Sequence, residues 1–388
     1  MAFERAQRLQ VLPPYLFAEI DRKKKAAIAA GRPILNLGIG DPDQPTPQFI
    51  IDALNEAVRD PATHQYALDE GDPTLRQTIA DWFKGRFGVS LNPKTEVLPT
   101  IGSKEAIAHL PLAVVNPGDV VLVPDPGYPV YRASTIFAGA EPYIMPLTAA
   151  NGFLPDLEAI PAEIRRRARL MFINYPNNPT SACATREFFV RAVEFARRHD
   201  VVLAQDAAYT ELYFEEAPMS ILEVPGASDV AIELHSFSKT FNMTGWRLGW
   251  ACGNAEIVGS LQKLKSNLDS GIFTAVQKAG VAALKGYERP EVAGLREMYR
   301  QRRDALVSGL RSVGLEPNVP NATFYVWVKC PEGKSSLEMA GLLLEKCDIV
   351  ATPGVGFGQC GDGYFRFALT QTTDRIAEAV ERIRKLGL

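Results

Sequence analysis

A short segment of the chain, residues 236–247, brings together a lysine, two serines and an arginine. It reads Ser-Phe-Ser-Lys-Thr-Phe-Asn-Met-Thr-Gly-Trp-Arg, with the amine at Lys239. The mostly apolar run 230–234 precedes it and is typical of a buried strand, so Lys239 should lie where a parallel strand ends and where ligands usually bind. Ser236, Ser238 and Arg247 supply neutral donors and a fixed cation, which is the set that a phosphate monoester needs.

An amine beside a phosphate site favours pyridoxal phosphate as a cofactor. Lys239 would bond covalently to the cofactor's aldehyde, while Ser236, Ser238 and Arg247 would hold its phosphate. A lysine after a strand is more often a solvated loop residue, and Ser-x-Ser-Lys is a weak motif when it stands alone. The prediction therefore depends on the other side chains that reach the same place.

Short apolar runs alternate with helical patterns through the middle of the chain, at residues 120–123, 170–173, 201–204 and 230–234. This alternation predicts an α/β fold with a mainly parallel central sheet flanked by helices on both faces. Each run is followed by a residue or pair that could serve a cofactor: Tyr128, Asn178, Asp206 with Tyr209, and Lys239. We expect these side chains to meet at the carboxyl edge of one sheet.

The residues after the strands match the needs of pyridoxal phosphate. The cofactor accepts electrons best when its ring nitrogen is protonated, and a buried Asp206 would hold that proton, unless it serves only to cap a turn or helix. Asn178 and Tyr209 could bond the ring's phenolic oxygen, and Tyr128 could stack on the ring or merely pack in its loop. Arg366 could bind a substrate carboxylate bidentately, or could form a surface ion pair.

Two further positions bear on the chemistry. Once a substrate amine displaces Lys239, this lysine can carry a proton from the substrate's alpha carbon, provided that its neighbours lower a pKa that is ordinarily about 10.4. Residues 97–107 pass from an extended segment into a helix, whose first free N–H groups would suit a phosphate. Ser103 at that helix start could instead be an N-cap.

Size and composition limit the class of protein. The 388 residues suit two domains, and we predict an N-terminal arm at 1–47 that joins the small domain, a large cofactor-binding domain at 48–280 and a small C-terminal domain at 281–388. A net charge of -3 gives no electrostatic footprint for nucleic acid or a membrane surface. The charged N-terminus and the absence of a long apolar run lead us to expect a cytoplasmic location. The cysteines are odd in number and widely spaced, so we expect reduced thiols and no metal site.

With these residues in view, the chain resembles the class I aminotransferases, which are fold-type I pyridoxal phosphate enzymes, over essentially its whole length. The resemblance depends on Asn178-Pro179-Thr180, Asp206-x-x-Tyr209, Ser236-x-Ser238-Lys239 with Arg247, and Arg366, in the family's order. It implies an α/β fold with a smaller α+β domain and a transaminase activity.

Within that family, four segments look like those of the LL-diaminopimelate aminotransferases: 12–20, 37–43, 101–105 and 265–271. This implies amino transfer between LL-2,6-diaminopimelate and 2-oxoglutarate, giving tetrahydrodipicolinate and glutamate, in lysine and cell-wall precursor synthesis. It also implies substrate contacts at Tyr15, Gly40, Lys104, Asn178, Asn267 and Arg366. The implied cofactor contacts are Tyr66, Ser103, Lys104, Tyr128, Asn178, Asp206, Tyr209, Ser236, Ser238, Lys239, Arg247 and Asn267.

The family works as a homodimer with shared active sites, so the resemblance implies that Tyr66 and Asn267 reach across from the partner chain. Two departures from the family pattern concern the site. Ser181 follows Asn-Pro-Thr where glycine is usual, which should alter the turn slightly and leave Asn178 in place. The loop after Tyr66 offers Asp69 and Glu70 where the diaminopimelate enzymes tend to carry a glutamate, and either carboxylate could read the distal amine.

Other functions remain open at this point. The same cofactor residues would serve a transaminase for aspartate, alanine, methionine or aromatic amino acids. A carbon-sulfur beta-lyase would release pyruvate and ammonia without a keto acid acceptor. A regulator fused to a DNA-binding module is disfavoured, because the N-terminal arm is too short and no basic recognition helix is visible.

Overall fold

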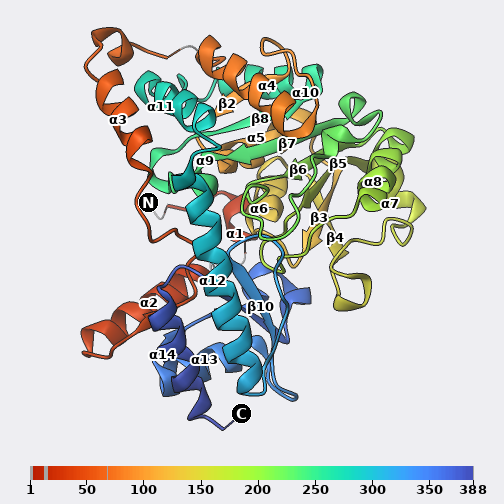
Figure 1. The fold of residues 1–388 in the computed structure, drawn as a ribbon. Helices are drawn as coiled ribbons and strands as arrows, with labels where there is room; N and C mark the ends of the chain where they lie inside the picture. Colours follow the sequence, from red (N-terminus) through yellow and green to blue (C-terminus); the bar gives the residue numbers. More distant parts are fainter. Residues whose placement is uncertain (1–2, 13–15, 68, 388) are drawn as a thin grey trace.

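The computed structural model describes residues 3–12, 16–67 and 69–387, and it is built around a seven-stranded sheet of order β2-β8-β7-β6-β5-β3-β4 (Figure 1). Its strands are β2 (Val97–Thr100), β3 (Val120–Asp125), β4 (Glu141–Pro146), β5 (Ala168–Asn174), β6 (Val202–Asp206), β7 (Ala231–Ser236) and β8 (Gly249–Gly253). Neighbours from β4 to β7 pair in parallel, whereas β8 is antiparallel to both β7 and β2. The mainly parallel α/β fold expected from the alternating apolar runs is confirmed. Sequence reasoning missed β4, an edge strand that begins and ends with exposed residues and contains prolines.

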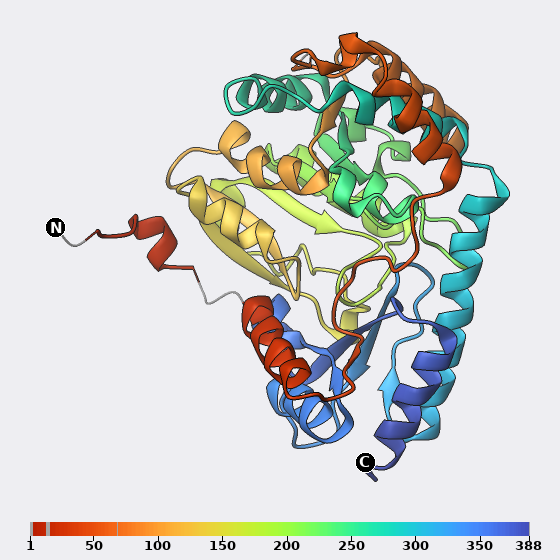
Figure 2. The ribbon, with the colours of Figure 1, turned by 90° about the vertical axis from the view of Figure 1, so that its left-hand side faces the viewer.

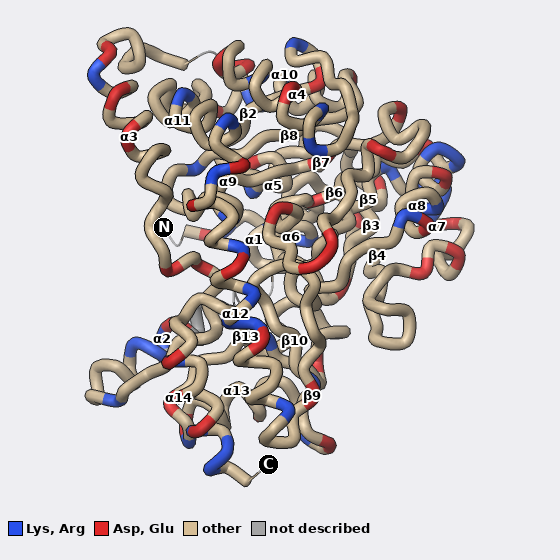
Figure 3. Tube along the Cα trace, viewed as in Figure 1, with Lys and Arg blue, Asp and Glu red and all other residues tan. Residues whose placement is uncertain are grey.

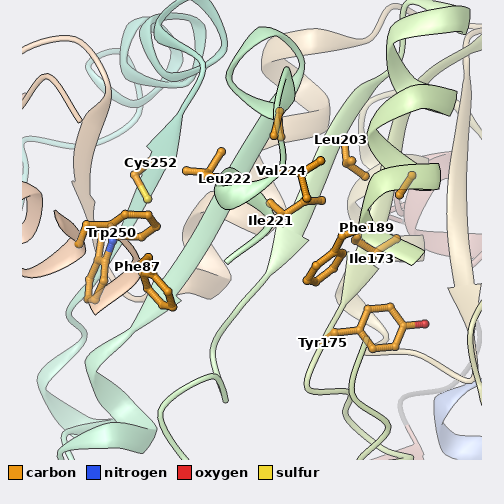
Figure 4. Packing of buried hydrophobic residues seen from close by; sticks show 14 of the residues in the cluster. Phe87, Ile173, Tyr175, Phe189, Leu203, Ile221, Leu222, Val224, Trp250 and Cys252 are labelled. Carbon is orange, nitrogen blue, oxygen red and sulfur yellow. The ribbon is translucent and has the colours of Figure 1, made fainter. Parts of the chain in front are cut away.

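Helices cover both faces of this sheet, because each face buries its own apolar cluster. One face packs against α5 (Ser103–Val114), α6 (Val130–Phe137) and α10 (Ala255–Lys265). The other packs against α4 (Pro73–Phe87), α8 (Arg186–His199) and α11 (Thr274–Lys285), with α3 (Gln48–Ala57) lying on α11. Figure 4 shows part of this second cluster, in which Trp250 lies near Phe87 and Phe189 lies near Ile173. Packing on both faces leaves the strand ends as the place where polar side chains can gather.

The C-terminal part forms a second unit with its own apolar cluster. A four-stranded antiparallel sheet, in the order β12-β13-β10-β9, consists of β9 (Glu316–Pro317), β10 (Tyr325–Lys329), β12 (Thr352–Pro353) and β13 (Tyr364–Ala368). Its helices are α12 (Pro290–Ser312), α13 (Ser336–Cys347) and α14 (Thr373–Arg384). Helix α12 contributes Val292 to the large cluster and Leu306 to the C-terminal one, and so spans both.

The N-terminal part lies beside this C-terminal unit. Strand β1 (Leu35–Asn36) pairs in parallel with β11 (Ile349–Val350), and Arg32 forms an ion pair with Asp348 at 2.7 Å. Figure 2 shows α2 (Leu16–Ala29) next to the C-terminal segments, while α1 (Gln7–Gln10) extends away from the body. The remaining α-helices are α7 (Ala162–Arg167) and α9 (Phe237–Thr240). We propose the three-part division of the chain with its last boundary between α11 and α12, since residue 280 falls inside α11.

Charged residues of both signs are interspersed along the chain (Figure 3). None of the helices in the described ranges is long and apolar enough to cross a membrane.

The large sheet and the C-terminal unit are joined through a buried carboxylate at the end of β3. Asp125 is 8% exposed and accepts hydrogen bonds from the backbone N–H groups of Gln359 at 3.1 Å and Cys360 at 2.9 Å. Two residues on, the N–H of Gly127 donates to the carbonyl of Phe357 at 2.8 Å. The loop around residues 357–360 is therefore fixed to the sheet edge through polar contacts.

Removal of this carboxylate should destabilise the protein. We expect Asp125→Ala to lower the free energy of unfolding by about 2–3 kcal/mol, because two backbone donors lose a partner in a buried place. Asp156→Ala is the matched control, since this exposed aspartate also accepts from two backbone N–H groups, those of Glu158 and Ala159, and should cost less than about 1 kcal/mol. Equal losses in the two variants, measured by urea unfolding, would contradict this account of the contact.

Candidate active site

A cavity of about 470 Å³ opens at the carboxyl edge of the large sheet. Most of the residues predicted from the sequence line it together: Gly40, Ser103, Lys104, Tyr128, Asn178, Asp206, Tyr209, Ser236, Ser238, Lys239, Arg247 and Arg366. Tyr66 and Asn267 are not among the lining residues of this single chain, and Tyr15 lies outside the described residues.

Lys239 enters the cavity from α9, directly after β7. Its Nζ donates to the carbonyl of Gly40 at 2.9 Å. Burial lowers the pKa of this amine to about 8; Asp41 opposes the shift, and the positive charges of Arg366 and Arg247 add to it. A considerable fraction of Lys239 is therefore neutral near pH 8, which is the form that can attack an aldehyde or accept a proton.

Asp206 ends β6 in the middle of the sheet and is 4% exposed. The hydroxyl of Tyr131 donates to Oδ2 at 2.6 Å, and the N–H of Ala208 donates to Oδ1 at 3.2 Å. Asp206 thus caps the turn after its strand and is also a buried carboxylate. Burial raises the pKa of Asp206 to about 6, although the hydrogen bond from Tyr131 opposes this rise. Both donors are neutral, so a cation placed in the cavity beside this carboxylate would be strongly stabilised.

The start of α5 and Arg247 form one wall of the cavity. The N-cap position belongs to Gly102, with φ +74°, and no side chain caps the helix, so the alternative of Ser103 as an N-cap is wrong. A Cβ on Gly102 would collide with the Arg247 guanidinium. Arg247 donates to the carbonyls of Thr244 at 2.8 Å and Ile101 at 3.3 Å, and these hydrogen-bond partners within the described ranges are neutral and do not compensate its charge. With Ser236 and Ser238 at the same cavity, the donor set fits a phosphate group.

Arg366 lies on β13 and is 3% exposed, so the alternative of a surface ion pair is wrong. Its Nη1 donates to Oδ1 of Asn178 at 2.7 Å, and its Nη2 donates to the carbonyl of Gly38 at 2.9 Å. The buried Nε has no hydrogen-bond partner among the described residues. A guanidinium held by neutral groups, with a donor to spare, suits a substrate carboxylate.

The segment after Asn178 takes the turn that glycine usually makes in the family. Ser181 has φ 62°, in the left-handed region, and is 5% exposed. Its hydroxyl donates to the carbonyl of Tyr325 at 2.7 Å and lies 2.8 Å from the hydroxyl of Thr323. These bonds offset the cost of the left-handed backbone in a residue with a side chain.

Sequence reasoning missed several residues that complete the site. The cavity is also lined by Ile107, Asn174, Ala208, Thr244, Tyr325 and Phe357, and Tyr131 supports Asp206 from beside it. Only Asn174 carried a signal that could have been used, because it ends β5 as Asp206 ends β6. Within the described ranges, no group of His, Cys, Asp and Glu side chains could hold a metal ion.

Comparison with known proteins agrees with this geometry. The family model for aminotransferase class I and II matches residues 32–383. The chain belongs to the class I and II aminotransferases. LL-diaminopimelate aminotransferase of Syntrophobacter fumaroxidans is 56% identical over 388 residues, covering 100% of both chains, and that of Aquifex aeolicus is 53% identical over 387 residues, again covering 100% of both. The solved structure of substrate-bound BacF from Bacillus subtilis has a TM-score of 0.95 at 39% identity, over 100% of this chain and 99% of that one.

This aminotransferase is a pyridoxal phosphate-dependent transaminase that acts on small molecules. Pyridoxal phosphate, when bound, supplies the electron-accepting ring through which an amino group moves between an amino acid and a keto acid. The residues of the cavity fit its parts. The serines and Arg247 match its phosphate, Lys239 its aldehyde, and Asp206 its ring nitrogen.

The lowered pKa of Lys239 leads to a pH prediction. The rate at which the apoprotein captures added pyridoxal phosphate covalently should rise with pH with a midpoint near 8, because the neutral amine reacts. Arg366→Met should move the midpoint to higher pH, since the charge of Arg366 lowers this pKa. The measurement is the cofactor's absorbance after rapid mixing, with Lys239→Ala as the blank. A midpoint near that of an ordinary lysine, about 10.4, would contradict the argument.

Proposed function

We propose that this aminotransferase catalyses the reversible transfer of an amino group between LL-2,6-diaminopimelate plus 2-oxoglutarate on one side and tetrahydrodipicolinate plus glutamate on the other, in lysine and cell-wall precursor synthesis. The observation that carries the proposal is the full-length similarity, at 51–56% identity, to proteins named LL-diaminopimelate aminotransferase. A cytoplasmic location remains a prediction.

The proposed roles follow from the positions of the side chains in the cavity. Lys239 is the attachment point and proton carrier, Asp206 holds the ring-nitrogen proton, and Tyr209 with Asn178 faces the phenolic oxygen. The phosphate is assigned to the α5 N-terminus, to the two serines after β7 and to Arg247, and the ring face to Tyr128. Arg366 takes the substrate's alpha-carboxylate.

The position of Lys104 favours a substrate that carries two carboxylates. It is exposed in the first turn of α5, lines the cavity, and its Nζ lies 6.0 Å from the centre of the Tyr128 ring. Lys104 and Arg366 are two cations of the cavity that can bind substrate carboxylates, in addition to the cations Lys239 and Arg247 that we assign to the cofactor. Both diaminopimelate and glutamate carry two carboxylates, so we assign the distal one to Lys104.

The distal amine of diaminopimelate requires an acceptor, which we place at Asp69 or Glu70. Glu70 already pairs with Arg76 at 3.3 Å, and the Arg76 side chain is only 6% exposed. Reversal of charge at the responsible residue, as Asp69→Lys or Glu70→Lys, should raise the KM for diaminopimelate at least about tenfold and that for glutamate far less. Comparable increases for both substrates would reject this assignment, and Glu332→Lys, at an exposed residue of the C-terminal unit, serves as the charge control.

We also propose that the enzyme is a homodimer whose sites are completed by Tyr66 and Asn267 of the partner chain. In a single chain Tyr66 is 92% exposed. Leu268, next to Asn267, is 54% exposed, and Phe273, whose ring lies 6.0 Å from that of His64, is 44% exposed. The amide of Asn267 donates to the carbonyl of Lys263 at 2.8 Å and is exposed. Large exposed apolar residues of this kind are typical of a subunit interface.

Mixed dimers test this sharing of sites. Lys239→Ala and Tyr66→Ala should each be nearly inactive, but a mixture refolded together should regain up to about a quarter of wild-type activity, because half of the chains pair as heterodimers with one intact site. A mixture of Lys239→Ala with Arg366→Met, both in the same chain's half of the site, is the control. Because Lys239 and Arg366 of one site belong to the same chain, each site of its heterodimers carries one of the two substitutions, and this mixture should regain nothing. Absence of recovery in the first mixture, or recovery in the control mixture, would contradict the sharing.

Single turnover tests the substrate. Enzyme loaded with pyridoxal phosphate should convert it to pyridoxamine phosphate rapidly with LL-diaminopimelate and with glutamate, and slowly with meso-diaminopimelate, aspartate or alanine. The cofactor absorbance follows the reaction. Rapid conversion by aspartate or an aromatic amino acid, with none by LL-diaminopimelate, would discard the proposed substrate and keep the transaminase. Pyruvate release without any keto acid would indicate a beta-lyase instead.

A further inference from the structure

Tyr325 on β10 contacts several residues of the cavity, but it has no role in the function proposed above. It is 3% exposed and lines the cavity, although it belongs to the C-terminal sheet. Its hydroxyl lies 3.0 Å from the hydroxyl of Tyr209, which follows β6 of the large sheet. The two phenols therefore share a hydrogen bond between the two halves of the molecule.

The same hydroxyl also affects the position of Lys239, because it lies against Gly40. A Cβ on Gly40 would collide with the Tyr325 hydroxyl, so only glycine lets the backbone pass there. The carbonyl of Gly40 accepts the hydrogen bond from Lys239 Nζ at 2.9 Å. Tyr325 consequently limits where this carbonyl, and with it the resting amine, can lie.

The ring and the backbone of Tyr325 make separate contacts. The guanidinium carbon of Arg366 lies 3.9 Å from the centre of the Tyr325 ring, within the range of a cation–π contact. The carbonyl of Tyr325 accepts from the Ser181 hydroxyl at 2.7 Å, which ties β10 to the turn after Asn178. One buried residue thus contacts Tyr209, Arg366 and the turn after Asn178, and also lies against Gly40, whose carbonyl binds Lys239.

We propose that Tyr325 is a positioning residue of the transaminase reaction, whose hydroxyl orients the hydroxyl of Tyr209 toward the cofactor's phenolic oxygen and whose ring orients Arg366 toward the substrate carboxylate. The inference rests on the roles proposed for Tyr209 and Arg366, and not on which amino acid is the substrate.

The contact between the two hydroxyls affects the hydrogen bond that Tyr209 would donate to the cofactor. Either phenol could donate in this hydrogen bond, and the proposed role has Tyr325 donate and Tyr209 accept. A phenol that accepts a hydrogen bond becomes a better donor, so this direction strengthens the bond from Tyr209 to an ionised phenolic oxygen. Burial raises the pKa of Tyr209 well above that of a free phenol, which keeps it protonated as a donor. Lys239, Arg366 and Asp206 also line the cavity here, and Tyr325→Phe changes none of these three side chains.

Two substitutions separate hydroxyl from ring. Tyr325→Phe should raise the pKa seen in the pH titration of the bound cofactor's absorption by about 0.5–1 unit, and should change the Kd of the unreactive dicarboxylate glutarate by less than about twofold. Tyr325→Leu should show the same shift and, in addition, weaken glutarate about tenfold, as expected for a lost cation–π contact of about 1–2 kcal/mol.

Two reference variants keep the test decisive. Tyr364→Phe, on the β13 strand that carries Arg366 and stacked on Trp327 at 5.4 Å, should leave both readouts unchanged. Tyr209→Phe should shift the titration; if it does not, the proposed role of Tyr209 fails and this inference with it. A shift in Tyr209→Phe but none in Tyr325→Phe, or glutarate binding that Tyr325→Leu leaves unaltered, would overturn the role of Tyr325 alone.

Discussion

The structure depends on a carboxylate that is buried at the centre of the sheet and whose hydrogen-bond donors among the described residues are neutral. Asp206 ends β6, with β5 on one side and β7 on the other, and its pKa is raised to about 6 by burial. A charged carboxylate in such a place is costly unless a cation approaches it. The protonated ring of pyridoxal phosphate would relieve that cost, so the binding of the cofactor and the protonation of its ring nitrogen become one event.

Apart from Asp206, the charged side chains that line the cavity are positive. Arg247 and Arg366 are both held by carbonyl and amide oxygens rather than by carboxylates. Their charges remain available for a phosphate and for a substrate carboxylate, and they also help to lower the pKa of Lys239. The site therefore combines anion binding with an amine that can lose its proton near neutral pH. A transaminase needs both properties.

The strand-end residues were predictable because a parallel sheet brings its carboxyl ends together. Lys239, Asp206 and Asn178 each follow an apolar run, and each lines the cavity as expected. Tyr325 and Tyr131 were not predictable, because one lies in a separate sheet and the other on a helix, and only tertiary packing brings them to the site. A sequence pattern predicts which face of a helix or strand is buried, but it does not predict which residue of another domain packs against that face.

Other parts of the prediction depend on contacts beyond one chain or on local detail. The exposure of Tyr66 is a property of the isolated chain, so its role requires the partner that the family resemblance implies. At Ser181 the departure from glycine was visible in the sequence, but the hydrogen bonds that stabilise its left-handed backbone come from residues more than a hundred positions away. Long-range contacts of this kind leave no periodic signal.

Pyridoxal phosphate would bind here as the partner of a buried carboxylate. A carbon-13 NMR titration of the aspartate carboxyl groups, on protein without and with pyridoxal phosphate and with Asp206→Asn used to assign the signal, measures this partnership. We expect the pKa of Asp206 to be about 6 in the apoprotein and to fall below about 4 when the cofactor is bound. A pKa that stays near 6 with the cofactor in place would contradict this partnership.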